Sequence, residues 1–330
     1  MNREKDQVMA CTDSRSAQPK TIQRTIPPLV VSRAKSVGPL GEAWLNSLDQ
    51  QISQLEDQWN ISVGEALFGG THAFVAYADG PNGEPYVLKL DMPENFGGDF
   101  AKGIAVLQMV DGRGYAKIYN YDLEKRACLL ERLGKPINQL NYTVWEQLRI
   151  ICSVLQQTWK IPVSETSFTN SAESVAWFRS FIAEAWEKQH RPCSEQVIKQ
   201  AFSYLQSREE AFNPAEFVLV HGDAHGGNTL ETLSGDGFRL IDPDGIVYEK
   251  AYDLGVLMRE WTEEYEQEPF KKGIERCEYL HTLTGVPFHA IWEWGYLQSV
   301  STGLLALQIG QEQMGRKMLR TAEHWARAEM

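Results

Sequence analysis

The chain has 330 residues, 43% of them hydrophobic, which is enough for one large or two medium domains with sizeable cores. Asp and Glu outnumber Lys and Arg by 44 to 32, and the net charge of -12 argues against nucleic acid as a partner, because phosphate backbones are bound by clustered cations. No apolar run approaches the length of a membrane-spanning helix, so the sequence predicts no membrane partner.

The five cysteines show neither close pairing nor a Cys-x-x-Cys spacing. An odd number of separated cysteines predicts reduced thiols and a cytoplasmic protein rather than a disulfide framework. Residues 1–28 are polar and lack the apolar middle of a secretory signal, so we interpret them as a disordered tail.

After this tail, the sequence pattern predicts a helix followed by several strands. Apolar residues spaced three and four apart predict an amphipathic helix over 41–59. Three strands are expected next, the first ending near Leu67 and the others at 73–78 and 86–90, with glycine-containing turns between them that indicate an antiparallel meander. A short helix at 99–110 and two strands around a turn at 122–125 complete this region.

After residues 134–136 the spacing becomes mostly helical, interrupted by two strand-like runs at 217–220 and 238–241. The predicted helical segments are 143–160, 173–189, 194–212, 250–266, 270–284, 288–310 and 313–328. The layout predicts an α+β protein of two lobes, a small antiparallel-sheet lobe at 29–133 and a larger, mostly helical lobe at 134–330. A cleft between two lobes is a common place for a ligand.

The stretch HGDAHGGN, residues 221–228, allows two interpretations. His-x-Asp-x-His in an extended segment places alternate side chains on one face, as in the metal site of a zinc hydrolase. No third cluster of His or Cys accompanies it, which favours His221 and His225 as hydrogen-bonded supports of a loop.

The other interpretation is a phosphotransfer loop. Asp223 precedes Asn228 by five positions, and Asp242 follows 14 positions later in Ile-Asp-Pro-Asp-Gly. An acid, an amide and a second acid suit phosphoryl transfer from a magnesium nucleotide, because one carboxylate faces the acceptor hydroxyl and the other two groups hold the metal through oxygen.

Such a site needs a cation and a backbone cradle for the donor phosphates. Lys89 lies in the strand-like run YVLKL, and Gly69-Gly70 occupies the turn one strand earlier. Taken alone, each is a weak signal, since a lone strand lysine is commonly solvated and paired glycines commonly make a plain hairpin turn.

Together these motifs resemble the aminoglycoside phosphotransferase family, which has a protein-kinase-like fold. The resemblance rests on the glycine turn, the strand lysine, Leu-Leu-Glu-Arg-Leu, His-Gly-Asp-x-His-x-Gly-Asn, Ile-Asp-Pro and Ala-Tyr-Asp-Leu-Gly. The segment DGRGYAKIYNYD with ACLLERL is most similar to the streptomycin 6-phosphotransferase and hydroxyurea phosphotransferase branch.

The resemblance implies an ATP- and Mg²⁺-dependent kinase of small molecules. Asp223 would orient the acceptor hydroxyl and accept its proton, Asn228 and Asp242 would hold Mg²⁺, and Lys89 would contact the α- and β-phosphates of ATP. The remaining implied roles are a hinge for adenine at Glu131, Arg132 and Leu133, and structural support from His221, His225 and Asp253.

The chain departs from the family pattern at two positions. The family's helix glutamate that pairs with the strand lysine is not evident in DFAKGIAVL, so Asp99 or Glu94 takes its place or the pairing is absent. Asp244 adds a carboxylate that either binds metal or caps a turn.

The acidic run EWTEEYEQE, residues 260–268, is either a solvated helix face or an electronegative wall for a cationic acceptor. In the second interpretation Glu260, Glu263 and Glu264 contact the substrate. Streptomycin carries guanidinium groups that carboxylates pair with, whereas hydroxyurea carries none, so the run favours an aminoglycoside. Hydroxyurea or another small acceptor, and a non-catalytic nucleotide-binding protein of the same fold, stay open, as does the oligomeric state.

Overall fold

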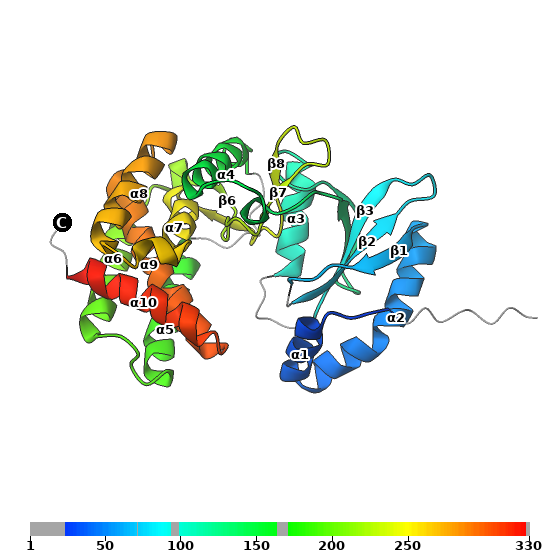
Figure 1. The fold of residues 1–330 in the computed structure, drawn as a ribbon, viewed down its shortest axis with the longest axis horizontal. Helices are drawn as coiled ribbons and strands as arrows, with labels where there is room; N and C mark the ends of the chain where they lie inside the picture. Colours follow the sequence, from blue (N-terminus) through cyan, green and yellow to red (C-terminus); the bar gives the residue numbers. More distant parts are fainter. Residues whose placement is uncertain (1–23, 71, 94–98, 164–170, 328–330) are drawn as a thin grey trace, which may run out of the picture.

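The computed structural model describes residues 24–70, 72–93, 99–163 and 171–327. Figure 1 shows a lobe built on a β-sheet beside a larger helical lobe, which is the two-lobed α+β architecture expected from the sequence. None of the helices in these ranges is long and apolar enough to cross a membrane.

The small lobe is built on a five-stranded antiparallel sheet in the order β1-β2-β3-β5-β4. The first three strands form the predicted meander, and β5 then inserts between β3 and β4. The strands are β1 Ser62–Ala66, β2 Ala73–Asp79, β3 Pro85–Asp91, β4 Ile118–Asp122 and β5 Ala127–Glu131.

Two helices, α1 (Pro28–Val37) and α2 (Pro39–Trp59), cover one face of this sheet. The sequence pattern predicts α2 but not α1, whose first residue, Pro28, is the last of the predicted tail. Arg24 already pairs with Glu56 of α2 at 2.7 Å, so the contacts of the sheet lobe begin before α1. Residues 1–23 of the predicted tail lie outside the described residues.

Strand alternation places Lys89 on the face of the sheet away from α1 and α2. Its neighbours Leu88 and Leu90 are fully buried in the cluster with those helices. Because successive side chains of a strand point to opposite faces, Lys89 and Cys128, its cross-strand partner on β5, face the other way. The loops of the helical lobe approach this second face.

Helix α3 (Phe100–Val110) belongs to the same hydrophobic cluster as the helical lobe. Leu130 on β5 and Leu254 on α7 (Ala251–Arg259) are further members of that cluster, so one core runs from the sheet into the large lobe. We propose the boundary between the lobes at residues 133 and 134, where the chain has left β5.

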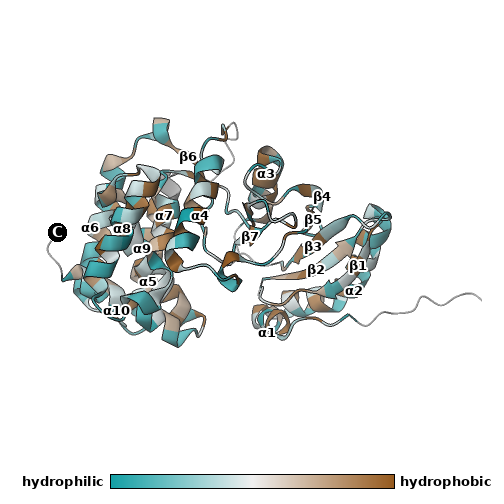
Figure 2. Ribbon diagram, turned by 45° about the horizontal axis from the view of Figure 1, so that its top comes forward, coloured by the Kyte–Doolittle hydropathy of each residue, from teal (hydrophilic) through white to brown (hydrophobic). Residues whose placement is uncertain are grey.

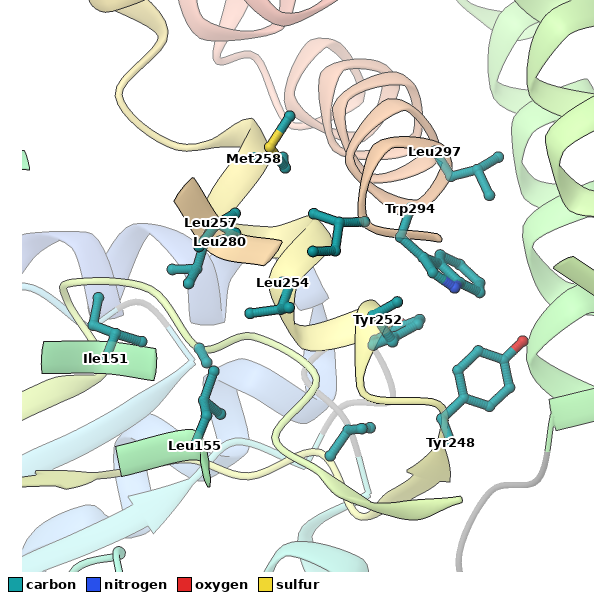
Figure 3. Packing of buried hydrophobic residues seen from close by; sticks show 14 of the residues in the cluster. Ile151, Leu155, Tyr248, Tyr252, Leu254, Leu257, Met258, Leu280, Trp294 and Leu297 are labelled. Carbon is teal, nitrogen blue, oxygen red and sulfur yellow. The ribbon is translucent and has the colours of Figure 1, made fainter. Parts of the chain in front are cut away.

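The large lobe is a bundle of helices centred on α9, whose residues are mostly buried. Figure 3 shows Leu254 and Leu257 of α7 packed with Leu280 on one side and Trp294 near Tyr252 on the other. The helices besides α7 are α4 Val144–Thr158, α5 Ser171–Lys188, α6 Glu195–Ala211, α8 Pro269–Thr284, α9 Phe288–Gln308 and α10 Glu312–Ala326. Figure 2 shows hydrophobic residues along β2 and β3 and hydrophilic ones on the outer helix α6.

Two short antiparallel pairs carry the chemical loops. β6 (Val218–Val220) pairs with β9 (Ile246–Tyr248), and β7 (Thr229–Glu231) pairs with β8 (Phe238–Leu240). The sequence pattern indicated β6 and β8 but not their partners β9 and β7, and each of these four strands is three residues long. Residues 221–228 connect β6 to β7, and residues 241–245 connect β8 to β9. Because β6 pairs with β9 and β7 with β8, each loop starts beside the end of the other.

Candidate active site

Asp253, in the first turn of α7, anchors the loop of residues 221–228 that follows β6. Its carboxylate accepts hydrogen bonds from the backbone N–H groups of His221 at 3.1 Å and Gly222 at 2.9 Å. Trp159 donates its indole N–H to the same carboxylate at 2.9 Å. Three donors satisfy this fully buried acid, which therefore fixes the turn of the loop.

His221 uses both ring nitrogens within the loop. Nε2 donates to the carbonyl of Ile241 at 2.7 Å, and Nδ1 accepts from the backbone N–H of Asp223 at 3.1 Å. Burial lowers the pKa of His221, in keeping with a neutral ring that donates through one nitrogen and accepts through the other. Neither nitrogen is left for a metal ion, so the geometry does not favour the zinc interpretation.

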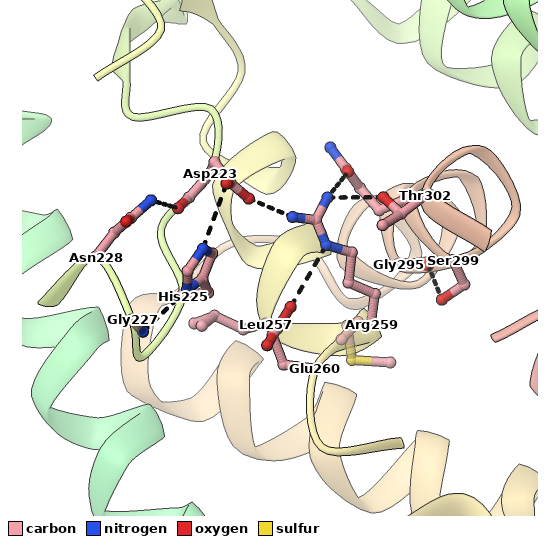
Figure 4. A network of polar contacts seen from close by, with 12 residues as sticks. Asp223, His225, Gly227, Asn228, Leu257, Arg259, Glu260, Gly295, Ser299 and Thr302 are labelled. Carbon is pink, nitrogen blue, oxygen red and sulfur yellow. Dashed lines mark hydrogen bonds and ion pairs between the residues drawn. The ribbon is translucent and has the colours of Figure 1, made fainter. Parts of the chain in front are cut away.

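Asp223 stands at the centre of the loop between two basic side chains (Figure 4). The Arg259 guanidinium donates to its Oδ1, and Nε2 of His225 lies 3.4 Å from its Oδ2. Burial on its own raises the pKa of Asp223, but Arg259 and His225 outweigh burial and hold that pKa well below its usual range. His225 is itself fixed, because its Nδ1 accepts from the N–H of Gly227 at 2.9 Å.

Asn228 and Asp242 lie next to each other through backbone pairing of the two loops. The N–H of Ile241 donates to the carbonyl of Asn228 at 3.0 Å. The Asn228 amide nitrogen donates to the carbonyl of Asp223 at 3.0 Å. The amide oxygen of Asn228 therefore points away from that carbonyl. Asp242 has a left-handed φ of 57°, uncommon for an aspartate, and its side chain stays 45% exposed. An amide oxygen and a carboxylate are donors that suit Mg²⁺.

Lys89 reaches this pair from the sheet. Its Nζ lies 2.8 Å from Oδ1 of Asp242, a contact between residues 153 positions apart that links the two lobes. Burial on its own lowers the pKa of Lys89, but Asp242 and Asp91 outweigh it and raise that pKa above its usual value. The lysine is therefore charged and points at the two loops.

The second carboxylate beside Lys89 is neither of the two that the sequence analysis named. Asp91 Oδ1 lies 3.3 Å from the lysine Nζ. Asp99 instead caps α3 by accepting from the N–H of Ala101 at 3.0 Å, and Glu94 lies outside the described residues. Asp91 is two residues along the strand from Lys89 and shares its face, which is the signal that could have found it.

Asp244 lies against the loop of residues 221–228. A Cβ atom on Gly222, whose φ is 94°, would meet the Asp244 carboxylate and would come within 2.8 Å of its Cβ. Burial and the charge of Asp223 raise the pKa of Asp244 to about 7. Its backbone N–H donates to the carbonyl of His221 at 2.9 Å, so this residue ties the second loop to the first.

The two predicted nucleotide-binding segments lie at the edges of this arrangement. Gly69, with a φ of 124°, and Gly70 lie between β1 and β2, with open space where a side chain would be. Arg132 folds back onto the sheet and donates to the carbonyl of Tyr86 at 3.1 Å. Within the described residues, no backbone hydrogen bond uses the main-chain groups of Arg132 or Leu133.

Glu131 faces the helical lobe rather than solvent. Its Oε2 accepts from the backbone N–H of Lys117 at 3.1 Å and lies 3.3 Å from Nε of Arg239 on β8. Glu131 thus links the two lobes and Arg132 packs onto the sheet, while the main chain at 132–133 makes no backbone hydrogen bond within the described residues.

The acidic run does not form one wall. α7 ends at Arg259 rather than continuing to residue 266, and a 3₁₀ turn at Thr262–Tyr265 follows. Glu260 lies near the Arg259 guanidinium, with Oε1 3.6 Å from Nε, but Glu264 pairs with the buried Arg276 at 2.6 Å and Glu263 is exposed. Of the three predicted substrate contacts, the structure brings only Glu260 close to the loop of residues 221–228.

A charged lysine on the sheet, facing an acid–amide–acid set on two loops of a helical lobe, defines a phosphotransferase of protein-kinase-like architecture that acts on small-molecule hydroxyl groups. The chain belongs to the aminoglycoside/hydroxyurea antibiotic resistance kinase family, whose model matches residues 58–287. It is 29% identical over 286 residues to streptomycin 6-kinase of Streptomyces glaucescens, which covers 86% of this chain and 91% of that relative.

Solved structures confirm the predicted fold. Aminoglycoside phosphotransferase APH(4)-Ia, in a ternary complex with ADP and hygromycin B, superposes with a TM-score of 0.62 at 15% identity, covering 83% of this chain and 97% of that one. Choline kinase LicA from Streptococcus pneumoniae gives 0.57 at 16% identity, covering 84% and 98%.

Proposed function

We propose that the protein transfers the γ-phosphoryl group of Mg–ATP to a hydroxyl group of a cationic small molecule, with a streptomycin-like aminoglycoside as the first choice. The observation that carries this proposal is the convergence of Lys89, Asp242, Asn228 and Asp223, which come from one strand and two loops. Phosphoryl transfer asks little covalent chemistry of a protein and depends on positioning and charge neutralisation, which this arrangement supplies.

Each group has a role in this proposal. Asp223 faces the acceptor hydroxyl, whose oxygen forms a bond to the γ-phosphorus as the bond from that phosphorus to the β-phosphate oxygen breaks. The hydroxyl proton passes to Asp223 and then to solvent, leaving ADP and a phosphate ester. Asn228 and Asp242 would hold Mg²⁺, which would supply positive charge to neutralise the phosphates.

The nucleotide is held by the sheet lobe. Lys89 pairs with the α- and β-phosphates, the backbone at Gly69 and Gly70 covers the phosphates, and the main-chain groups at 132–133 bind adenine. The open space at the two glycines and the free main chain of the hinge support these assignments.

The preference for a cationic acceptor rests on the carboxylates around Asp223. Asp244 lies close enough to Asp223 for the charge of Asp223 to raise its pKa, and Glu260 lies 3.6 Å from the arginine that contacts Asp223. Guanidinium groups pair well with carboxylates. The similarity to a protein named streptomycin 6-kinase favours the same choice. Hydroxyurea, which has no cationic group, gains nothing from these acids.

A panel of ATP-coupled assays with streptomycin, other aminoglycosides and hydroxyurea tests the proposal. Asp223→Asn should lower transfer about 10⁴-fold and leave measurable residual activity. The thermal shift caused by Mg–ATP should be retained, because the carboxylate serves the acceptor and not the nucleotide. Asp111→Asn, an exposed carboxylate 3.5 Å from Lys117, is the matched control and should behave as wild type.

Each alternative predicts a different result. Phosphorylation of hydroxyurea and of no aminoglycoside would overturn the acceptor preference but keep the kinase. Binding of Mg–ATP without transfer to any acceptor would favour the non-catalytic nucleotide-binding protein. Full activity in Asp223→Asn would remove the role given to that carboxylate.

A further inference from the structure

Arg259 contacts Asp223 but has no role in the reaction proposed above. It is the last residue of α7, and its side chain is only 11% exposed. Its guanidinium donates to Asp223 on one side and, through Nη1, to Gln298 at 2.6 Å and Thr302 at 2.9 Å on the other. Figure 4 shows it between the loop and α9.

The crossing of α7 and α9 fixes where this guanidinium lies. A Cβ atom on Gly255 would come within 2.8 Å of the backbone carbon of Trp294, and one on Gly295 within 2.8 Å of Cγ of Met258. Two glycines at the crossing therefore let the helix backbones approach closely. Arg259 lies one helical turn beyond Gly255, so the crossing brings it against α9.

The partners of Arg259 on α9 hold it independently of Asp223. Gln298 and Thr302 lie four residues apart and therefore on one face of the helix. Both accept hydrogen bonds from Nη1, and Glu260 faces Nε at 3.6 Å. A guanidinium is a rigid planar fork, so two contacts on one side fix the direction of the nitrogen that faces Asp223.

Asp223 is thereby held through both carboxylate oxygens. Oδ1 accepts from Arg259 and Oδ2 faces His225, which leaves the carboxylate no free rotation. Its side chain nevertheless stays 39% exposed, so one edge remains open to an acceptor. In-line transfer needs the hydroxyl within a few tenths of an ångström and a narrow range of angles of its productive position.

We infer that Arg259 is a positioning residue for phosphoryl transfer, which sets the orientation of the Asp223 carboxylate and links it to α9. The inference rests on the proposed function in taking Asp223 as the group that receives the hydroxyl. In this inference Arg259 does not contact the nucleotide, so a variant that lacks its guanidinium should lose turnover and keep its affinity for ATP.

Kinetics of Arg259→Ala, Arg259→Lys and the control Arg316→Ala, an exposed arginine of α10, test the inference. We expect kcat of Arg259→Ala to fall about 100-fold, as for a misplaced reacting group, with KM for ATP within about twofold of wild type. Guanidinium ion at millimolar concentration should restore part of kcat. Arg259→Lys should stay below wild type, because an ammonium group lacks the fork.

A double variant separates positioning from general damage to the fold. Arg259→Ala should cost nothing further in Asp223→Asn, because the two residues act as a unit. Wild-type kcat in Arg259→Ala, or an equal loss in both backgrounds, would overturn the inference. If Arg259→Ala does not fold, Thr302→Val removes a single acceptor of Nη1 and should lower kcat by several-fold; unchanged kcat there counts against the inference.

Crystal structures give a readout that does not need an acceptor. The Asp223 side chain should rotate away from its wild-type orientation in Arg259→Ala, and an unchanged side chain would overturn the inference. If the wild-type protein phosphorylates nothing in the panel, the proposed function fails, while this structural comparison still decides the role of Arg259.

Discussion

Lys89 and Asp91 occupy alternate positions of β3, and this spacing explains how a chain without an evident helix glutamate can still pair its strand lysine. Side chains two apart on a strand share a face, so the 3.3 Å contact follows from the strand itself. If Asp242 holds Mg²⁺ as proposed, Asp91 is the carboxylate of the described residues that remains beside the lysine.

We therefore predict that Asp91→Asn raises KM for ATP about tenfold, because a hydrogen bond between charged groups contributes about 1.5–3 kcal/mol. kcat should change less than KM, since the acceptor side is untouched. Steady-state kinetics with varied Mg–ATP measure both quantities. An unchanged KM beside an unchanged Asp111→Asn control would show that Asp91 does not position Lys89.

The buried thiols give a stability that depends on pH. Burial raises the pKa of Cys152 to about 12, whereas an unburied thiol titrates near 9.0. The folded protein holds this proton more tightly, so the stabilising contribution is complete below pH 9 and is lost as the pH rises from 9 towards 12.

Cys152→Ala should accordingly lose less stability than wild type on going from pH 8 to pH 11. The difference in slope is at most about 1.4 kcal/mol per pH unit for one thiol. Urea unfolding at a series of pH values measures it. Parallel curves for the two proteins would contradict the prediction.

At the scale of elements, α7 ends where Arg276 of α8 meets it. The Arg276 guanidinium donates to the carbonyl of Glu260 and to the carboxylate of Glu264, and it lies 4.4 Å from the ring centre of Tyr265. This arginine is 1% exposed. It satisfies backbone carbonyls at the end of a helix, so the turn that carries Arg259 and Glu260 depends on it.

Arg276→Met should lower the free energy of unfolding by about 3 kcal/mol or more, because it leaves Glu264 and several carbonyls without their donor. Arg316→Met, at an exposed ion pair of α10, should change it by less than about 0.5 kcal/mol. Urea unfolding compares the two. Equal effects would show that burial of Arg276 contributes nothing beyond a surface pair.

The features that depend on neighbouring residues could be predicted from the sequence, whereas those that depend on distant contacts could not. The strands β1 to β5 and the loop residues Asp223 and Asn228 follow from periodicity and from a short motif. The end of α7 does not, because the spacing of residues 250–266 is helical and only Arg276 and the 3₁₀ turn interrupt it. Arg259 was missed because its partner lies 36 residues away.

The strands β7 and β9 were missed, although β6 and β8 are equally short and were predicted. Apolar runs at 217–220 and 238–241 indicated β6 and β8, whereas the strand state of β7 and β9 depends on the partners that pair with them. α1 begins with a proline and packs through Val30 and Ala34, a pattern too brief to separate from the polar segment before it.

At the scale of the molecule, the two lobes share more than a hinge. The larger hydrophobic cluster includes α3 and Leu130 of the sheet lobe together with the helices of the large lobe. The ion pair of Lys89 with Asp242 adds a polar link between the two lobes. Such continuity couples the stability of the two lobes.

We predict a single thermal unfolding transition, with equal calorimetric and van't Hoff enthalpies, despite a chain of 330 residues. Differential scanning calorimetry measures both enthalpies. Two resolved transitions, or a calorimetric enthalpy well above the van't Hoff value, would show that the lobes unfold separately.

The division of the core into two clusters also sets the order in which the two cores can form while the chain is synthesised on the ribosome. The smaller cluster draws on residues no later than Leu129, so it can close once that part of the chain has emerged. The larger one needs Trp325 as well as Phe100, and it stays open until translation is nearly finished. During that interval the nascent α3 exposes an apolar face, and a chaperone that binds such faces would meet the protein there.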